Sequence, residues 1–161
     1  MPVDPETFKK TLGCWASGVT IVTSQFGAER LGMTVSAFSS VSLSPPLVLV
    51  CADKASNTNA LIQKSRAFTV NVLSTEQSAL SNLFADKKRE AIRFDGLACT
   101  AGATGCPRLP GALSALDCHV RDEIDAGDHI VYIALVEAAE FESERAPLVY
   151  FRGAYKSLGP I

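Results

Sequence analysis

The sequence predicts a mainly β protein with short peripheral helices, arranged as a small closed or split antiparallel β-barrel. About six or seven apolar or alternating segments are separated by turns rich in glycine, proline and polar residues. These segments do not alternate regularly with long helices, so a doubly wound parallel sheet is disfavoured. Closing an antiparallel sheet into a barrel would also remove its exposed edges.

The chain of 161 residues is expected to form one domain, spanning 1–161. It contains no internal repeat, low-complexity segment or interdomain linker, and 47% of its residues are hydrophobic, which suits a filled core. The net charge of −2 offers no basic field, so nucleic acid is not expected as a partner. No apolar run approaches the ~20 residues that span a bilayer, so no membrane partner is expected either.

The five cysteines are an odd number, widely spaced, and form no C-x-x-C pair. This pattern argues against a disulfide scaffold and against a zinc site, and we expect no metal. The N-terminal residues also lack the charged and apolar regions of a signal peptide. Free, largely buried thiols in a reducing compartment are therefore expected, and we expect the protein to be cytoplasmic.

The first element is predicted to be a short helix. Asp4 is a candidate N-cap and Pro5 suits the first helical position. Apolar residues at i, i+4 and i+7 form one stripe, and Gly18 ends the element. The stripe consists of Phe8, Leu12 and Trp15.

The strands are predicted from apolar alternation, or from continuous apolar runs where both faces are buried. Turns separate them at 25–30, which holds Gly27, at Pro45-Pro46 and at 125–128. The strands are expected at residues 19–24, 32–43, 47–52, 67–73, 116–121, 129–141 and 148–155.

Two further helices and a loop are predicted between these strands. The polar stretch 53–58 leads into a short helix through Leu61 and Ile62. Ser74 and Gln77 match a capping box that begins a third helix. Its inward residues are expected to be Leu80, Leu83 and Phe84. Residues 98–110, rich in glycine and proline, are expected to form a loop.

Two polar segments stand out as a candidate binding site. The predicted strand 32–43 carries hydroxyls where a solvated strand would usually carry charge, and the D-K-x-S-N-T sequence at 53–58 precedes a helix. Helix N-termini bind phosphate through unpaired N–H groups and the helix dipole. Together the segments suit a nucleotide-like cofactor with a phosphate, and a flavin fits that description. Considered alone, a strand of this kind is more often a solvated face, and an S-N-T sequence is more often a plain helix cap.

The sequence gives little support for other kinds of catalytic site. The sequence contains no dinucleotide-binding G-x-G-x-x-G, no P-loop and no H-E-x-x-H. A nucleophilic pair of Cys51 or Cys118 with His129 has no supporting local pattern. A zinc site from Cys99, Cys106 and His119 lacks the spacing of metal ligands.

Five separated motifs, read in order, resemble the short-chain flavin reductase family over residues 8–158. They are GVTIVT at 18–23, GMTVSAFSSVSLSPPLVLV at 32–50, FTVNVL at 68–73, GDHIVY at 127–132 and PLVYFRGAY at 147–155. The resemblance implies an FMN-binding split barrel, usually a homodimer. It also implies hydride transfer from NADH or NADPH to FMN or FAD, with the reduced flavin passed to a partner monooxygenase.

The resemblance also implies which residues form the site. Thr34, Val35 and Ser36 would lie along the flavin ring, and Ser39 and Ser40 nearer the ribityl chain and phosphate. The full set expected to bind the flavin is Met33, Thr34, Val35, Ser36, Ser39, Ser40, Cys51, Ala52, Asp53, Lys54, Ser56, Asn57 and Thr58. Those expected near the nicotinamide are His129, Phe151 and Tyr155.

Two alternatives remain open on the same fold. A flavin-binding or electron-carrier protein would hold a flavin without reducing free flavin. An oxidase of phosphorylated pyridoxine would need several arginines around a phosphate, and Lys54 is the one cation near the predicted binding stretch. The sequence does not distinguish FMN from FAD or NADH from NADPH.

Overall fold

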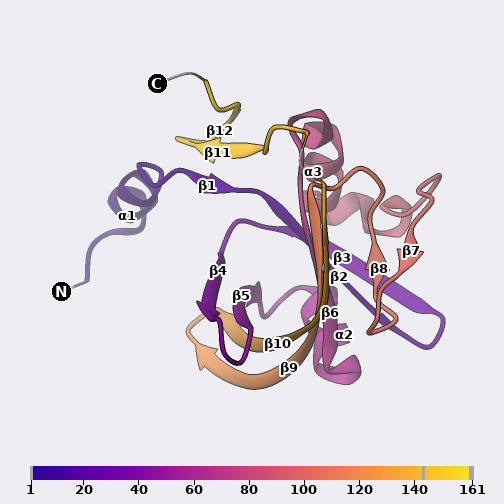
Figure 1. The fold of residues 1–161 in the computed structure, drawn as a ribbon. Helices are drawn as coiled ribbons and strands as arrows, with labels where there is room; N and C mark the ends of the chain where they lie inside the picture. Colours follow the sequence, from indigo (N-terminus) through magenta and orange to yellow (C-terminus); the bar gives the residue numbers. More distant parts are fainter. Residues whose placement is uncertain (1, 143, 160–161) are drawn as a thin grey trace.

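A seven-stranded antiparallel sheet forms the body of the protein and curls into a barrel (Figure 1). The computed structural model describes residues 2–142 and 144–159. The strand order is β3-β2-β6-β9-β10-β5-β4. The strands are β2 (Thr20–Phe26), β3 (Glu29–Val35), β4 (Phe38–Ser42), β5 (Leu47–Asp53), β6 (Ala67–Val72), β9 (Ser114–Ala126) and β10 (His129–Phe141). The predicted mainly β, antiparallel fold class is confirmed.

The two edge strands of this sheet, β3 and β4, are consecutive in the chain. Only Ser36 and Ala37 separate them. Two residues span only about 7 Å, so the end of β3 and the start of β4 must lie close together. The sheet therefore curls until its edges meet at this point, which closes one end of the barrel.

Two apolar clusters fill the fold. The interior of the barrel holds Val22, Val50, Phe68 and Tyr132, each fully buried. The Tyr132 hydroxyl donates a 2.6 Å hydrogen bond to Asn59 Oδ1, which satisfies the one polar atom of this large side chain. The second cluster lies under the third α-helix and includes Ile21, Leu73, Phe84, Phe94 and Leu148.

The helices pack around the barrel. Helix α2 (Asn57–Ser65) begins at Ser56, whose side chain accepts from the Thr58 N–H. The predicted capping box is confirmed, because the Ser74 N–H donates to Gln77 Oε1 at 3.0 Å. It opens a 3₁₀ turn, η1 (Thr75–Gln77), that leads into α3 (Ser78–Ala85) and η2 (Lys87–Ile92).

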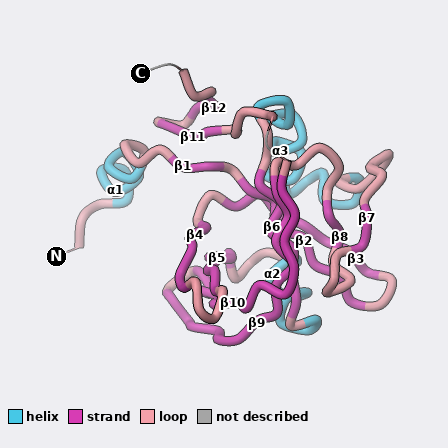
Figure 2. The backbone as a smooth tube through the Cα atoms, viewed as in Figure 1, coloured by secondary structure: helices cyan, strands magenta, loops and turns pink. Residues whose placement is uncertain are grey.

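The remaining elements form an arm that extends from the barrel on the side where both termini lie (Figure 2). The arm comprises α1 (Pro5–Leu12), β1 (Ser17–Gly18), β11 (Val149–Phe151) and β12 (Ala154–Lys156). The strands pair in the order β1-β11-β12. The Asp4 side chain caps α1 as predicted, but no residue of this helix is buried.

Several predicted boundaries are wrong. The N-terminal helix ends at Leu12, and its apolar stripe is exposed because the arm stands away from the barrel. The expected strand 32–43 is divided between β3 and β4, and Leu43 is 94% exposed in the turn before β5. The expected strand 148–155 is a hairpin that turns at Arg152 and Gly153, both at positive φ.

Other differences from the predicted boundaries arise because neighbouring strands pair over more residues than expected. Strands β2 and β3 pair up to Phe26 and Glu29, so the predicted turn 25–30 shrinks to two residues, with Gly27 at φ 60. Pairing with β10 extends β9 well beyond 116–121. The expected loop 98–110 contains two short paired strands, β7 (Thr100–Ala101) and β8 (Pro107–Arg108). In the described part of the chain, no helix has the length and apolar character needed to cross a membrane.

Candidate active site

Three adjoining cavities follow the segment from Met33 to Ser39. We call them the first, middle and third cavities, with volumes of about 220, 370 and 660 Å³. The first and middle cavities share Thr34 and Ala85. The middle and third cavities share Ser36, Tyr150 and Gly153. The hydroxyl-rich segment therefore lines three adjoining cavities, which we together call the trough.

The first cavity is built around two cations at the start of helix α2. Ser56 and Asn57 of the helix N-terminus line it together with Lys87 and Arg93 from the chain after α3. The Arg93 side chain is only 3% exposed, and it donates to the carbonyls of Gly32 at 2.7 Å and Asp86 at 2.9 Å. Its buried Nε has no partner among the described residues.

Carboxylates balance part of this positive charge. Lys87 Nζ lies 3.1 Å from Asp53 Oδ2, and Asn57 Nδ2 donates to Glu90 Oε1 at 2.7 Å. The Ala55 N–H and then Lys87 hold the pKa of the Asp53 carboxyl below its ordinary value. Burial lowers the pKa of Arg93, and the charge of Glu90 works against that change. A cavity with two cations and a helix N-terminus is suited to a phosphate group.

The middle cavity is lined by hydroxyl and amide groups over an apolar floor. Thr34 Oγ1 donates to the Ser81 carbonyl at 2.6 Å. The Tyr155 hydroxyl donates to Ser81 Oγ at 2.8 Å and lies 3.0 Å from Asn82 Oδ1. Val19 contributes an apolar surface. This mixture of donors, acceptors and apolar contacts suits a polar heteroaromatic ring.

The third cavity lies between the arm and the strands β4 and β5. Its apolar surface includes Leu12, Trp15, Phe38, Leu49 and Tyr150. Its cations are Lys9 and Arg152, both from the arm.

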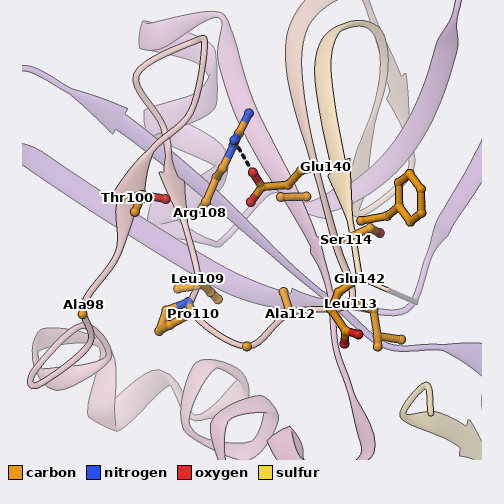
Figure 3. Close-up of a pocket in the computed structure, with 13 residues that line it drawn as sticks. Ala98, Thr100, Arg108, Leu109, Pro110, Ala112, Leu113, Ser114, Glu140 and Glu142 are labelled. Carbon is orange, nitrogen blue, oxygen red and sulfur yellow. Dashed lines mark hydrogen bonds and ion pairs between the residues drawn. The ribbon is translucent and has the colours of Figure 1, made fainter. Parts of the chain in front are cut away.

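A separate cavity of about 330 Å³ lies between the segment before β9 and the end of β10 (Figure 3). Arg108 lines it but is already paired with Glu140 and with the buried Asp117. Within the part of the chain that the structure describes, this cavity contacts none of the predicted site residues. It is therefore not a candidate for the flavin site.

A scan against family models matches residues 12–159 to the flavin reductase like domain. This match covers most of the chain. The chain belongs to the flavin reductase-like family.

Curated relatives in this family include enzymes of two kinds. The chain is 35% identical over 156 residues to the FMN reductase (NADH) RutF of Escherichia coli, covering 97% of this chain and 95% of that protein. It is 39% identical over 153 residues to the 4-hydroxyphenylacetate 3-monooxygenase reductase component of Thermus thermophilus, covering 95% and 96%.

Solved structures of the family share the fold over nearly the whole chain. The NADH:FAD oxidoreductase SgcE6 of Streptomyces globisporus, in complex with NAD and FAD fragments, matches with a TM-score of 0.91 and 32% identity. That match covers 99% of this chain and 98% of the other. The flavin reductase PheA2 in its native state matches with a TM-score of 0.90 and 35% identity, covering 98% and 100%.

Many of the residues predicted from the family motifs line the trough. The first cavity includes Met33, Thr34, Asp53, Ser56 and Asn57; the middle one Thr34, Ser36 and Tyr155; the third Ser36, Ser39 and Cys51. Burial raises the pKa of the Cys51 thiol, so this cysteine stays protonated at neutral pH.

The other predicted residues do not line these three cavities. Val35, Ala52 and Thr58 are buried, and Ser40 and Phe151 lie outside the lining. Lys54 Nζ is held 2.7 Å from Asp125 and from the Gly127 carbonyl, away from the first cavity. His129 begins β10 opposite Asp53, and its Nδ1 lies 2.7 Å from Asp128 Oδ1. Their assigned roles stay predictions.

Sequence analysis missed several residues of the trough. Lys87 and Arg93 follow helix α3, far along the chain from the hydroxyl-rich segment. Ser81 and Asn82 of helix α3 also line the trough and were not among the predicted site residues. No local spacing links these residues to the motifs, because the fold alone brings them together.

The residues of the trough fit a flavin. Arg93 lines the first cavity, and its Nε, which has no partner among the described residues, is a polar atom that a bound group could satisfy. The first cavity offers cations for a phosphate, and the middle cavity offers donors and acceptors for a ring edge.

Proposed function

We propose that this chain is an NADH-dependent flavin reductase that supplies reduced FMN or FAD to a partner oxygenase. The observation that carries the proposal is the row of adjoining cavities, cationic at one end and hydroxyl-lined in the middle, built on the family's motifs. The relative named FMN reductase (NADH) supports the NADH-dependent reduction of flavin. The relative named as a monooxygenase reductase component supports the supply of reduced flavin to an oxygenase.

In this proposal Lys87 and Arg93 bind the flavin phosphate in the first cavity. Thr34 and Ser36 hold the ring edge along the middle cavity, which Tyr155 also lines. A bound flavin supplies the hydride acceptor, and the protein supplies position and polarity. Holding nicotinamide and flavin rings in stacked contact is what makes the transfer fast.

The protein needs little acid–base equipment for this reaction. The sequence holds two histidines, and only His129 is a candidate contact for the nicotinamide. Hydride moves directly from nicotinamide C4 to flavin N5, so no side chain has to carry a proton in that step. Donors around the middle cavity stabilise the negative charge that develops on the flavin ring.

NADH is favoured by the names of the relatives, and NADPH is included as an alternative donor. FMN and FAD are both included as acceptors. We also propose a cytoplasmic location, supported by the free cysteines and by the need for a nicotinamide coenzyme.

We propose that the protein is a homodimer. Large apolar side chains are exposed, including Phe8 at 51%, Val41 at 45% and Leu43 at 94%. Apolar surface of this kind often marks a protein–protein interface. Sedimentation at micromolar concentration should give the mass of a dimer, and a pure monomer with intact activity would count against this part of the proposal.

The test of the function is a turnover assay. Purified protein, mixed with free FMN or FAD in excess, should consume NADH or NADPH with saturation in both substrates. A folded sample that shows no turnover with any pair of nicotinamide and flavin would overturn the proposal. A sample that retains a bound flavin through gel filtration and reduces no free flavin would favour the electron-carrier alternative.

A further inference from the structure

The charged side chains that line the first cavity cancel one another. Among the residues that the structure describes, Lys87 and Arg93 supply two positive charges to its wall, and Asp53 and Glu90 supply two negative charges. A phosphate that enters this cavity meets two carboxylates as well as two cations. Because like charges repel, the wall binds a phosphate less tightly than the two cations alone would bind it.

The Asp53 carboxylate occupies donors of the kind that a phosphate uses. Its Oδ1 accepts from the Ala55 N–H at 2.8 Å, and its Oδ2 accepts from Lys87 Nζ at 3.1 Å. The carboxylate is charged at neutral pH, because the Ala55 N–H and then Lys87 hold its pKa below the ordinary value. A backbone N–H just before a helix and a lysine are common partners of phosphate groups. Asp53 therefore competes with a phosphate for both donors.

Glu90 has the same relation to the second cation. Its Oε1 accepts from Asn57 Nδ2 at 2.7 Å, and its Oε2 lies 3.4 Å from Arg93 Nη1. The Glu90 side chain is 25% exposed and that of Arg93 only 3%, so solvent screens this pair weakly. Glu90 therefore competes with a phosphate for an amide and for a cation.

Lys87 is the cation that moves more easily. Its side chain is 72% exposed, whereas Arg93 is buried and is also held by the Gly32 carbonyl at 2.7 Å. An exposed ion pair contributes little to stability, so Lys87 can leave Asp53 for a phosphate at small cost. Phosphate binding is then an exchange of one anion for another at Lys87.

We propose that Asp53 and Glu90 keep the affinity for the flavin phosphate low, so that the flavin dissociates readily. Asp53 acts by competing for Lys87, and Glu90 acts by competing for Arg93. The inference rests on the proposed function, which identifies the phosphate as that of a flavin. It gives Asp53 a role opposite to the favourable flavin contact expected from the family motif. A protein that supplies reduced flavin to a partner needs a flavin that leaves, and the two carboxylates meet that need.

The binding test measures flavin affinity without a nicotinamide. Flavin fluorescence, followed during titration with protein, gives Kd for FMN and for riboflavin, which has no phosphate. Asp53→Asn should lower Kd for FMN about two- to fivefold, the range of one exposed charge pair, and should leave Kd for riboflavin unchanged. Added salt should reduce this gain. Weaker binding of both flavins would show that Asp53 contacts the flavin favourably, and the proposal would then be wrong.

A double variant tests whether Asp53 acts through Lys87. In the Lys87→Gln background, Asp53→Asn should lower Kd for FMN by less than it does in the unaltered protein, because no lysine is released. An equal gain in both backgrounds would contradict the competition for Lys87.

Asp125→Asn is the matched control. It removes the same charge from an aspartate that lies 2.7 Å from Lys54 Nζ and does not line the first cavity. Its Kd for FMN should equal that of the unaltered protein. Equal tightening by Asp125→Asn and Asp53→Asn would mean a general effect of net charge and would overturn the proposal.

Glu90→Gln tests the second carboxylate and serves on its own if Asp53→Asn does not fold. The amide oxygen can still accept from Asn57, while the charge beside Arg93 is removed. This variant should also lower Kd for FMN and leave Kd for riboflavin unchanged. If neither variant binds FMN more tightly, the carboxylates do not set the affinity and the proposal fails.

Failure here is distinguishable from failure of the proposed function, because the titration needs no turnover. Tighter FMN binding by Asp53→Asn in a protein that reduces no flavin would leave this inference standing and remove the reductase activity. Flavin reduction with an unchanged Kd for FMN in both variants would do the reverse. In an active protein, stopped-flow fluorescence should also show FMN leaving Asp53→Asn about two- to fivefold more slowly.

Discussion

The Tyr155 hydroxyl donates a 2.8 Å hydrogen bond to Ser81 Oγ, joining the last strand of the chain to helix α3. The same hydroxyl lies 3.0 Å from Asn82 Oδ1. All three residues line the middle cavity. The arm is therefore fastened to the barrel at the place where the flavin ring is proposed to lie.

Tyr155→Phe should loosen this attachment. Losing the hydroxyl should cost about 0.5–1.5 kcal/mol of unfolding free energy and lower kcat/KM for NADH. Denaturant unfolding and steady-state kinetics measure the two effects. Tyr150→Phe is the matched control, because in the described part of the chain the Tyr150 hydroxyl makes no hydrogen bond. Equal losses of unfolding free energy and of kcat/KM in both variants would mean that the hydrogen bonds of the Tyr155 hydroxyl have no role.

Lys87→Gln should weaken the binding of phosphorylated flavin. Because Lys87 is 72% exposed, the expected increase in KM for FMN is modest, about two- to fivefold. Riboflavin, which has no phosphate, should keep its KM. Lys88→Gln changes a neighbouring lysine outside the cavity and should alter neither value. A riboflavin KM that rises as much as that of FMN would place the phosphate elsewhere.

Thr58→Val should separate the folding role of this residue from its predicted flavin role. The Thr58 hydroxyl is fully buried and unpartnered in the described structure, and valine has nearly the same shape. The flavin-free protein should gain about 1 kcal/mol of unfolding free energy, since an unsatisfied group is removed. Flavin affinity, measured by fluorescence titration, should fall. Unchanged affinity would remove Thr58 from the flavin site.

His129→Ala tests the predicted nicotinamide contact. His129 is 43% exposed and hydrogen-bonded to Asp128, whose pKa this bond lowers. We expect a higher KM for NADH or a lower kcat, by roughly two- to twelvefold, with flavin affinity nearly unchanged. If only flavin affinity falls, the nicotinamide lies elsewhere. If neither constant changes, His129 is a solvated residue of the hairpin turn.

Asp117 should make the fold sensitive to acid. Burial raises the pKa of the Asp117 carboxyl, but bonds from Arg108, the Ala103 N–H and Thr69 outweigh burial and hold the pKa below its ordinary value. Its contribution to stability is therefore present above the unfolded pKa of about 4 and is lost as pH falls through the folded pKa.

Asp117→Asn should remove this acid-dependent stability and cost about 3–5 kcal/mol at neutral pH, because Arg108 loses a buried partner. Urea unfolding across a pH series measures both effects. Asp122→Asn is the control, since Asp122 is paired with Arg121 on the surface. Similar unfolding free energies for the Asp117→Asn and Asp122→Asn variants would contradict the stabilising role given to Asp117.

Features set by a few neighbouring residues could be predicted from the sequence. The Asp4 cap, the Ser74–Gln77 capping box and the Gly27 turn depend on local backbone geometry, and the structure contains all three. The hydroxyls of Thr34 and Ser36 were predicted to face a ligand, because charge is absent where a solvated strand would carry it, and both residues line the middle cavity.

Features set by distant contacts could not be predicted. Lys54 was expected to lie along one edge of the flavin, but Asp125, 71 residues away, holds its side chain at the β9–β10 hairpin. The division of residues 32–43 arises because the sheet curls and its edges must meet at Ser36 and Ala37. Neither the Lys54–Asp125 contact nor the division of residues 32–43 into two strands can be predicted from the spacing of residues in the sequence.

The two-residue link between β3 and β4 both closes one end of the barrel and lines a cavity, so a ligand in that cavity should affect how firmly the barrel is closed. Ser36 and Ala37 form the seam where the edges of the sheet meet, and both line the third cavity. The Ala37 carbonyl accepts from the Cys51 N–H at 3.0 Å, which ties the seam to β5. A ligand held against this link binds the closed barrel and not an opened one, so binding stabilises the closed form. The Cys51 amide, which donates to the Ala37 carbonyl, should therefore exchange more slowly in the occupied protein than in the empty one.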